Sequence, residues 1–266
     1  MNLFIREMKA HRKSLIIWCI AIILLVISGM GKYKTYSSSG QSINELMKQM
    51  PKSLSALLGM GSFDLSKISG YYGMLLVYIL LMAGIHAAMV GANIISKEER
   101  DKTAEFLLAK PISRNKIVTA KLSATFLNIV IFNLVTLISS MCVVYKFNNK
   151  GEPMNHYIIM LMAGMFIFQL LFLSIGTVIA AISKNPKVAT TFSTLILVIT
   201  YLISVFIDMN SKLEVLKFLT PFKYFDSSEL MYGSGFSAGY LLLSIIIIIG
   251  LLLSTYLFYN KRDLNV

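Results

Sequence analysis

The sequence predicts an all-α integral membrane protein with six transmembrane helices, folded as a single domain over residues 1–266. The composition is strongly apolar: 56% of the residues are hydrophobic and the mean hydropathy is +0.70. Only 14% are charged, against about 25% in an average soluble domain. A helix needs about 20 apolar residues to cross a bilayer. The runs that meet this requirement lie at about 14–30, 71–95, 119–145, 157–182, 188–208 and 239–259.

These runs are predicted to be helices and not strands of a barrel. Lipid leaves no partner for exposed backbone groups, so only helices and closed barrels span a membrane. Barrel strands alternate apolar and polar residues, whereas a segment such as "SIIIIIGLLLS" at 244–254 is continuously apolar. Cys19 and Cys142 lie within such runs, so they do not predict a disulfide framework.

The positions of lysine and arginine predict the orientation. An even number of spans places both termini on one side, together with the 96–121 segment and the loop at 183–187. This side carries 15 of the 25 basic residues, including all five arginines. Because basic loops stay in the cytoplasm, we expect both the N- and C-termini to be cytoplasmic. The net charge of +12 then reflects topology, and no nucleic-acid partner is expected.

The loops at 31–70, 146–156 and 209–238 are assigned to the outer side. In the first, apolar residues repeat at helical spacing and predict amphipathic helices on the outer leaflet. They are Ile43, Leu46, Met47, Met50, Leu54, Leu57 and Leu58. In the third loop, Leu213, Leu216 and Leu219 predict another such helix, which ends at Pro221.

The first fourteen residues predict an interfacial helix on the inner side that leads into the first span. One face carries Leu3, Phe4, Met8 and His11, and the basic residues Arg6, Lys9 and Lys13 lie on other faces. Anionic lipid attracts each basic residue at its surface by about 1 kcal/mol. The lipid bilayer is therefore the first expected partner.

The sequence contains no motif for catalysis, and the chain is not expected to be an enzyme. It has no GxxxxGK[ST], HExxH or GxSxG pattern and no Cys/His cluster at metal-ligand spacing. We therefore expect it to bind neither a metal nor a cofactor of its own. An ionisable residue inside a membrane is a functional candidate, although hydrogen bonding between helices is favoured here. The candidates are His86, Asn93, Asn128 and Gln169. Glycines at 84, 91, 164 and 176 predict close helix packing.

The segment "EERDKTAEFLLAKPISR", residues 98–114, interrupts the apolar chain with charges of both signs. Ser96 and Glu99 form an S-x-x-E pattern that predicts the start of a helix, and Pro111 predicts its end. Ser113 is placed to cap the third span. Acidic residues contribute little to topology, so this segment has two equally weighted interpretations: a solvated loop, or a docking surface for another protein.

A longer stretch, "EERDKTAEFLLAKPISRNKIVTAKL" at 98–122, resembles the segment between the second and third spans of type-2 ABC exporter permeases. Lys102 stands where these permeases usually have glycine, which predicts a changed turn or a longer helix. Residues 46–73, "LKFLTPFKYFD" at 216–226 and "LFYNKRDL" at 257–264 resemble the same family. The matching residues in 98–122 are Thr103, Glu105, Leu107, Leu108, Pro111, Ser113, Arg114 and Lys121.

This resemblance implies the permease subunit of an ATP-driven bacterial exporter in the plasma membrane. ATP and Mg would be bound by a separate ABC ATP-binding subunit, and a second permease subunit, identical or related, would complete the pathway. Residues 98–114 would be a cytoplasmic coupling helix. Polar contacts with the ATPase would be made by Glu98, Glu99, Arg100 and Glu105, and apolar contacts by Phe106, Leu107 and Leu108. The segment would be stiffened by Pro111 and Arg114. The coupling set is completed by Thr103 and Ser113.

The cargo expected from spans rich in Met, Leu, Ile and Phe is amphipathic or hydrophobic, such as an antimicrobial peptide, a drug or a lipid-like molecule. An ATPase-linked immunity or sensing component that does not translocate its ligand is the alternative. An integral membrane lipid enzyme is disfavoured, because no catalytic constellation is present.

Overall fold

A computed structural model of the chain describes residues 3–39, 45, 49–60, 63–103, 105, 111–148, 151–183 and 185–261. Within these residues the fold is all-helical, and six helices are long and apolar enough to cross a membrane. The predicted fold class is therefore confirmed. The helices are α1 (Leu3–Gly31), α5 (Ile68–Arg100), α7 (Arg114–Phe147), α8 (Met154–Ile182), α9 (Pro186–Met209) and α11 (Ala238–Lys261).

Most of the helices extend beyond the apolar runs that predicted them. α5 continues to Arg100, and α7 already begins at Arg114. The N-terminal segment, predicted to form an interfacial helix that leads into the first span, is continuous with that span in α1, which runs without a break from Leu3. Charged residues therefore lie on the end turns of the membrane helices themselves.

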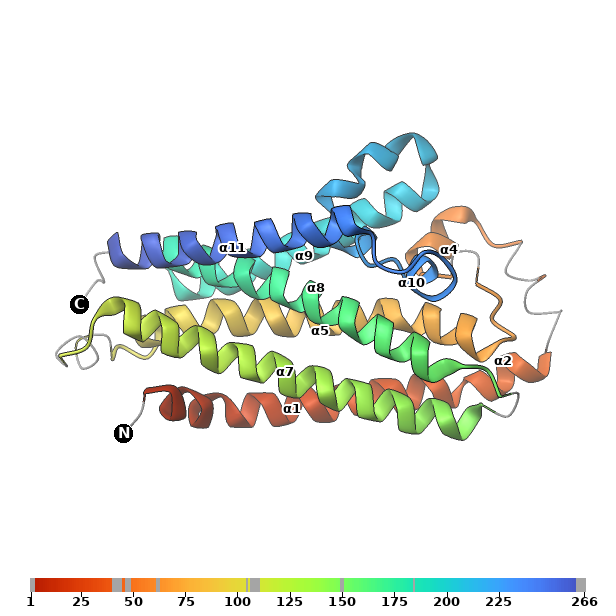
Figure 1. The fold of residues 1–266 in the computed structure, drawn as a ribbon, viewed down its shortest axis with the longest axis horizontal. Coiled ribbons are helices and arrows are strands. Elements are labelled where there is room, and N and C mark those ends of the chain that lie inside the picture. Colours follow the sequence, from red (N-terminus) through yellow and green to blue (C-terminus); the bar gives the residue numbers. More distant parts are fainter. Residues whose placement is uncertain are drawn as a thin grey trace.

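The six helices lie side by side along the long axis of the molecule (Figure 1). α1 begins and α11 ends at one end of this bundle, where α5 also ends and α7 begins. We call this the terminal end. The opposite end, the distal end, carries the short elements α2 (Tyr33–Ser39), α4 (Lys52–Leu57), η1 (Ser211–Leu219), η2 (Pro221–Lys223) and α10 (Ser227–Tyr232).

The helix predicted in the 209–238 loop is present as η1, a 3₁₀ helix that ends at Leu219, just before Pro221. In the 31–70 loop, Leu54 and Leu57 lie in α4, where both are exposed. This six-residue helix is shorter than the predicted amphipathic one. The residues Ile43, Leu46 and Met47 lie outside the part of the chain that the structure describes.

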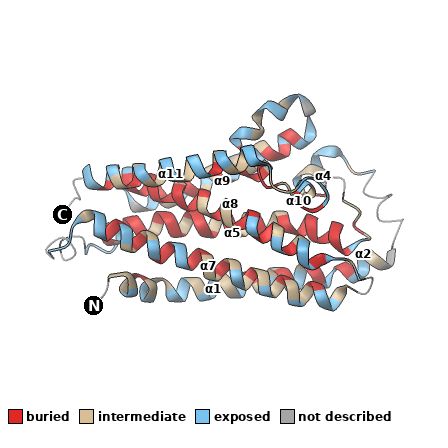
Figure 2. Cartoon of the chain, viewed as in Figure 1, coloured by how far each residue is buried: buried red, intermediate tan, exposed pale blue. Residues whose placement is uncertain are grey.

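α5 and α8 form the centre of the bundle, and most of their residues are buried (Figure 2). Glycines allow the two helices to cross closely. A Cβ atom on Gly91 would lie 2.4 Å from the carbonyl oxygen of Leu173, and one on Gly176 would lie 2.4 Å from that of Ala88. The prediction that these glycines mark close packing is confirmed.

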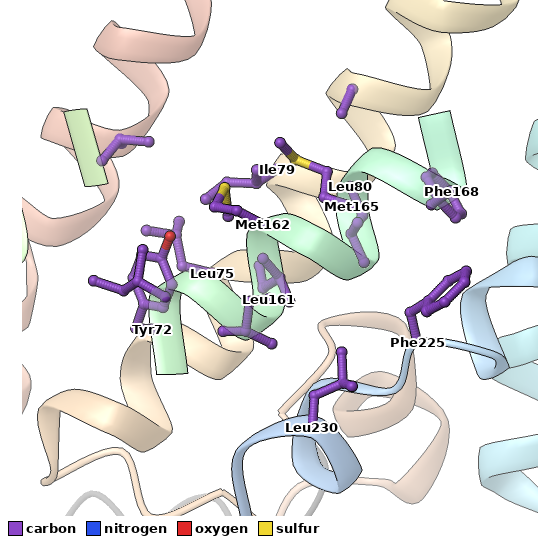
Figure 3. Close-up of a cluster of buried hydrophobic side chains, with 14 of the residues drawn as sticks. Tyr72, Leu75, Ile79, Leu80, Leu161, Met162, Met165, Phe168, Phe225 and Leu230 are labelled. Atoms are coloured by element: carbon purple, nitrogen blue, oxygen red, sulfur yellow. The ribbon is translucent and has the colours of Figure 1, made fainter. Parts of the chain in front are cut away.

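Towards the distal end, the core is a cluster of apolar side chains from α5, α8 and the segment around α10 (Figure 3). Phe225 and Leu230 come from the latter segment and pack near Gly164 of α8, where a Cβ atom would lie 3.1 Å from Leu230 Cδ1. The other labelled members are Tyr72, Leu75, Ile79 and Leu80 of α5 and Leu161, Met162, Met165 and Phe168 of α8. The distal loops are thus anchored to the central helix pair.

Candidate functional site

α5 continues through Ser96 into the first residues of the 98–114 segment. Ser96 is buried, and its hydroxyl donates a 2.7 Å hydrogen bond to the carbonyl oxygen of Ala92 one turn earlier. A serine side chain bonded back in this way sits inside a helix and does not cap one. The predicted capping box at Ser96 is therefore wrong, because α5 continues through Ser96 to Arg100.

α5 ends at a left-handed turn centred on Lys102, whose φ is 53°. The amide of Thr103 donates to the carbonyl of Glu98 at 2.8 Å, and that of Lys102 donates to the carbonyl of Glu99 at 3.3 Å. This pair of bonds is the Schellman motif, which normally carries glycine at the left-handed position. Lys102 therefore keeps the turn that a glycine would make, and the helix is not extended as the missing glycine had suggested.

A buried ion pair joins the end of α5 to α7. Lys121 is fully buried, and its ammonium lies 2.5 Å from Glu98 Oε2. The same ammonium also donates to the backbone carbonyl of Ile94. A buried charge is tolerated when it is paired and hydrogen-bonded. Lys121, which the sequence matched to the family pattern, thus has its partner inside this chain.

The ion pair continues into α1. Arg6 lies 3.4 Å from Glu98 Oε1 and 2.9 Å from Glu7 Oε1, and Lys97 lies 3.2 Å from Glu7 Oε2. We call these side chains (Arg6, Glu7, Lys97, Glu98 and Lys121) the terminal charge cluster. It ties α1, α5 and α7 together directly beside the 98–114 segment. Glu7 was missed in the sequence, although an acid within a basic N-terminal stretch was a usable signal.

The cluster changes the role of Glu98 in the predicted coupling set. Its residue is only 6% exposed, and its carboxylate faces the bundle and not solvent. Glu99 is half-buried, whereas Arg100, Thr103 and Glu105 are exposed. Glu99, Arg100 and Glu105, and not Glu98, present charge at the surface of the terminal end.

Arg100 makes a hydrogen bond to Asn93, which the sequence predicted to lie in the membrane interior. Its guanidinium donates to Asn93 Oδ1 at 2.8 Å and lies 3.2 Å from Asp101. The hydroxyl of Thr190 on α9 also approaches Asn93 Oδ1, at 3.5 Å. Asn93 therefore belongs to the terminal end, where it connects α5 with α9.

The 98–114 segment is anchored at its C-terminal end, where Arg114 begins α7. Phe106, Leu107 and Leu108 lie outside the described residues, so the predicted coupling helix is not described. Pro111 and Ser113 are exposed, and Ser113 occupies the N-cap position of α7 without a side-chain capping bond. Arg114 donates to the carbonyl oxygens of Asn260 at 2.9 Å and Tyr259 at 3.5 Å. It thereby connects the start of α7 to the last turn of α11, whose carbonyls lack helical partners.

His86, one of the polar candidates in the membrane interior, is packed between aromatic side chains of two other helices. His86 is fully buried and stacks on Phe132 with ring centroids 4.5 Å apart, and Trp18 lies 5.4 Å away. Neither ring nitrogen has a hydrogen-bond partner among the described residues, so the expected interhelical hydrogen bond of His86 is wrong. Aromatic packing occupies its surroundings instead.

The side-chain amides of Gln169 and Asn128 differ in whether they hydrogen-bond to another helix or to their own. Gln169 of α8 accepts a 3.3 Å hydrogen bond from Asn133 of α7, as predicted for an interhelical contact. Asn128 donates to the carbonyl of Ala124 in its own helix at 3.1 Å. No contact between these amides and the terminal charge cluster is present in the described part of the chain.

The described architecture is thus a six-helix membrane bundle with an ion-paired end beside a charged connecting segment. A sequence model of the ABC-2 family transporter proteins matches residues 1–264, nearly the whole chain. A comparison with curated proteins gave no match. The family match covers all six membrane helices, and the chain belongs to the ABC-2 transporter family as a multi-pass membrane permease.

Proposed function

We propose that this chain is the permease subunit of an ATP-driven exporter and that its terminal end faces the cytoplasm. In this proposal the 98–114 segment transmits the motion of a separate ATP-binding subunit to the membrane helices. The observation that carries it is the terminal charge cluster, which joins the end of α5 to α1 and α7 directly beside that segment. The basic residues concentrated at this end support the cytoplasmic orientation.

Movement of the 98–114 segment is transmitted to the membrane helices because the ion pairs and hydrogen bonds that anchor the segment are costly to break. A displacement of the α5 end would pull on Lys121 through Glu98, and on α1 through Arg6 and Glu7. Separating a buried ion pair leaves an uncompensated charge, at a cost of about 3–5 kcal/mol. Arg114 passes the movement of the other end of the segment to α11. The helices therefore follow the segment and do not detach from it.

The contacts with the ATP-binding subunit are assigned to side chains that are accessible. Arg100, Thr103 and Glu105 are exposed and Glu99 is half-buried, so they supply the polar contacts. Phe106, Leu107 and Leu108 supply the apolar ones. Glu98 acts as a positioning residue through Lys121 and Arg6. ATP and Mg are bound by the partner subunit and not by this chain.

A second permease subunit, identical or related, completes the pathway in a bacterial plasma membrane. Broad apolar faces on α1, α9 and α11 support contacts with lipid and with this subunit. Exposed examples are Ile17 and Leu24 on α1, Phe206 on α9, and Leu242 and Leu257 on α11. The cargo is amphipathic or hydrophobic.

Reconstitution tests export against sequestration. The permease is incorporated into liposomes with its ATP-binding subunit, and a fluorescent amphipathic amine is followed. ATP-dependent movement of the probe across the bilayer is expected, and a partner subunit unable to hydrolyse ATP is the matched control. Saturable binding without ATP-dependent movement would contradict export and favour an immunity component.

A further inference from the structure

A cavity of about 770 Å³ lies at the distal end, between α4, α5, α9 and the segment at 220–228. Its volume is in the range of small-molecule binding sites. Much of its wall is apolar. Leu80 and Phe225 line it and also belong to the buried core cluster, so the floor of the cavity is the core itself (Figure 3). The other large apolar lining residues are Met50, Met60, Phe63, Leu65, Val77, Val205 and Phe222.

The walls of the cavity are held in place by specific contacts. Gly59 has a φ of 66°, and a Cβ atom there would lie 2.5 Å from Val77 Cγ2. The connection after α4 therefore lies directly against α5, as only glycine permits. On the other side, the hydroxyl of Tyr201 donates a 2.5 Å hydrogen bond to the carbonyl of Leu57, which ties α4 to α9.

Among the residues that the structure describes, the lining has more carboxylates than ammonium groups. Lys223 is shared between two of them: its ammonium lies 2.5 Å from Asp208 Oδ1 and 3.3 Å from Asp226 Oδ2. Asp64 is the third carboxylate in the lining, and Lys52 is the second cation. Of the two carboxylates that contact Lys223, Asp208 is the more accessible, with 45% of its side chain exposed. The charges of the described lining residues therefore sum to a negative value.

We propose that this distal cavity binds amphipathic molecules that carry an aliphatic amine. The ammonium of the ligand would join Lys223 beside Asp208, and its apolar tail would lie on Val77, Leu80 and Phe225. An anionic amphiphile is disfavoured, because Lys223 already has two carboxylate partners and the charges of the described lining residues sum to a negative value. As a site for cargo, the proposal rests on the proposed export function; as a binding site, it stands on the cavity alone.

Calorimetry on the purified permease, in maltoside micelles and without an ATP-binding subunit, tests this site. The probes are dodecylammonium and dodecanoate, which share a chain and differ in charge. We expect dodecylammonium to bind saturably and more tightly than dodecanoate. Asp208→Asn should weaken dodecylammonium binding about fivefold, the order that a half-exposed ion pair allows.

Two further variants separate the site from general surface charge. Glu214→Gln removes an acid from the same end but outside the cavity, where 61% of its side chain is exposed, and should leave the affinity unchanged. Lys223→Met removes the resident ammonium and should strengthen dodecylammonium binding. Equal affinities in the parent, Asp208→Asn and Glu214→Gln proteins, or equal binding of both probes, would overturn the proposal. Because no ATPase is present, failure of ATP coupling leaves this result unaffected.

Discussion

The ammonium of Lys121 lies 2.5 Å from Glu98 Oε2, and this contact joins the last turns of α5 to the early turns of α7 in a fully buried position. Glu98 is the first residue of the 98–114 segment, which resembles the coupling region of ABC exporter permeases, and Lys121 follows the end of that segment. The chain therefore carries a rigid connection on either side of this segment: Lys121 with Glu98, and Arg114 with the end of α11.

Replacing Glu98 with glutamine should destabilise the protein by about 3–5 kcal/mol, because Lys121 would keep a buried charge without its carboxylate. The midpoint of thermal unfolding in detergent measures this loss. Glu105→Gln, at an exposed position, is the matched control and should have little effect. Restoring stability by adding Lys121→Met to Glu98→Gln would show that the unpaired ammonium causes the loss; equal unfolding midpoints for Glu98→Gln and the parent would contradict the ion pair.

Lys102→Gly should stabilise the end of α5. A left-handed conformation costs a non-glycine residue about 1–2 kcal/mol, which exceeds the added backbone entropy of glycine of about 0.5–1 kcal/mol. A gain of about 0.5–1 kcal/mol is therefore expected in thermal unfolding. Asp101→Gly is the control: its φ of −88° needs no glycine, so only a loss is expected, from backbone entropy and from its exposed contact with Arg100. A loss of stability in both variants would contradict the left-handed turn.

Gly176→Ala should disturb the crossing of α5 and α8, because its Cβ atom would lie 2.4 Å from a backbone oxygen that cannot move independently. Overpacking of this kind costs about 1–3 kcal/mol. Gly250→Ala on α11 is the matched substitution, since nothing lies within 4 Å of its Cβ position. The yield of folded protein and its unfolding midpoint distinguish the two, and equal values for both would be inconsistent with a close crossing.

Asp226 makes the stability of the distal end depend on pH. Burial raises the pKa of this carboxyl, but the charge of Lys223 and the hydrogen bonds from Ser228 outweigh it and lower the pKa below its ordinary value. A carboxyl with a lowered pKa in the folded state stabilises the protein above its unfolded pKa of about 4, and this contribution is lost as the pH falls towards the folded pKa.

We therefore expect Asp226→Asn to lower the unfolding midpoint at pH 7 and to have a smaller effect at pH 3. Asparagine can still accept the 2.9 Å capping bond from the amide of Ser228, so the loss at pH 7 reports the charge of the carboxylate. A difference between the two proteins that stays constant from pH 7 to pH 3 would contradict the role of the ionised carboxylate.

The membrane helices were predictable because each depends on a long apolar run, a property of contiguous sequence. The close packing at Gly91 and Gly176 was predictable for a similar reason, since glycine within a span has few other uses. Local reasoning failed at Ser96. The S-x-x-E pattern is the same in a cap and in a helix interior, and only the preceding turns of α5 decide between them.

The terminal charge cluster was not predictable from the sequence, because Glu7, Glu98 and Lys121 are far apart in the chain and only the packing of α1, α5 and α7 brings them together. For the same reason the sequence did not show that Glu98, predicted to contact the ATPase, is paired with Lys121 inside the bundle. The surroundings of His86 were equally unpredictable from the sequence, since Trp18 and Phe132 reach it from two other helices.

Co-purification with the ATP-binding subunit tests the central claim most directly. The permease carrying Glu99→Lys and Glu105→Lys is co-expressed with that subunit, and the amount recovered with the permease is measured. Glu214→Lys, the same charge reversal at the distal end, is the control. A fall of at least about fivefold for the double variant alone is predicted, because like charges would then face each other across the contact. Recovery equal to that of the parent, in a double variant with an unchanged unfolding midpoint, would contradict coupling through residues 98–114.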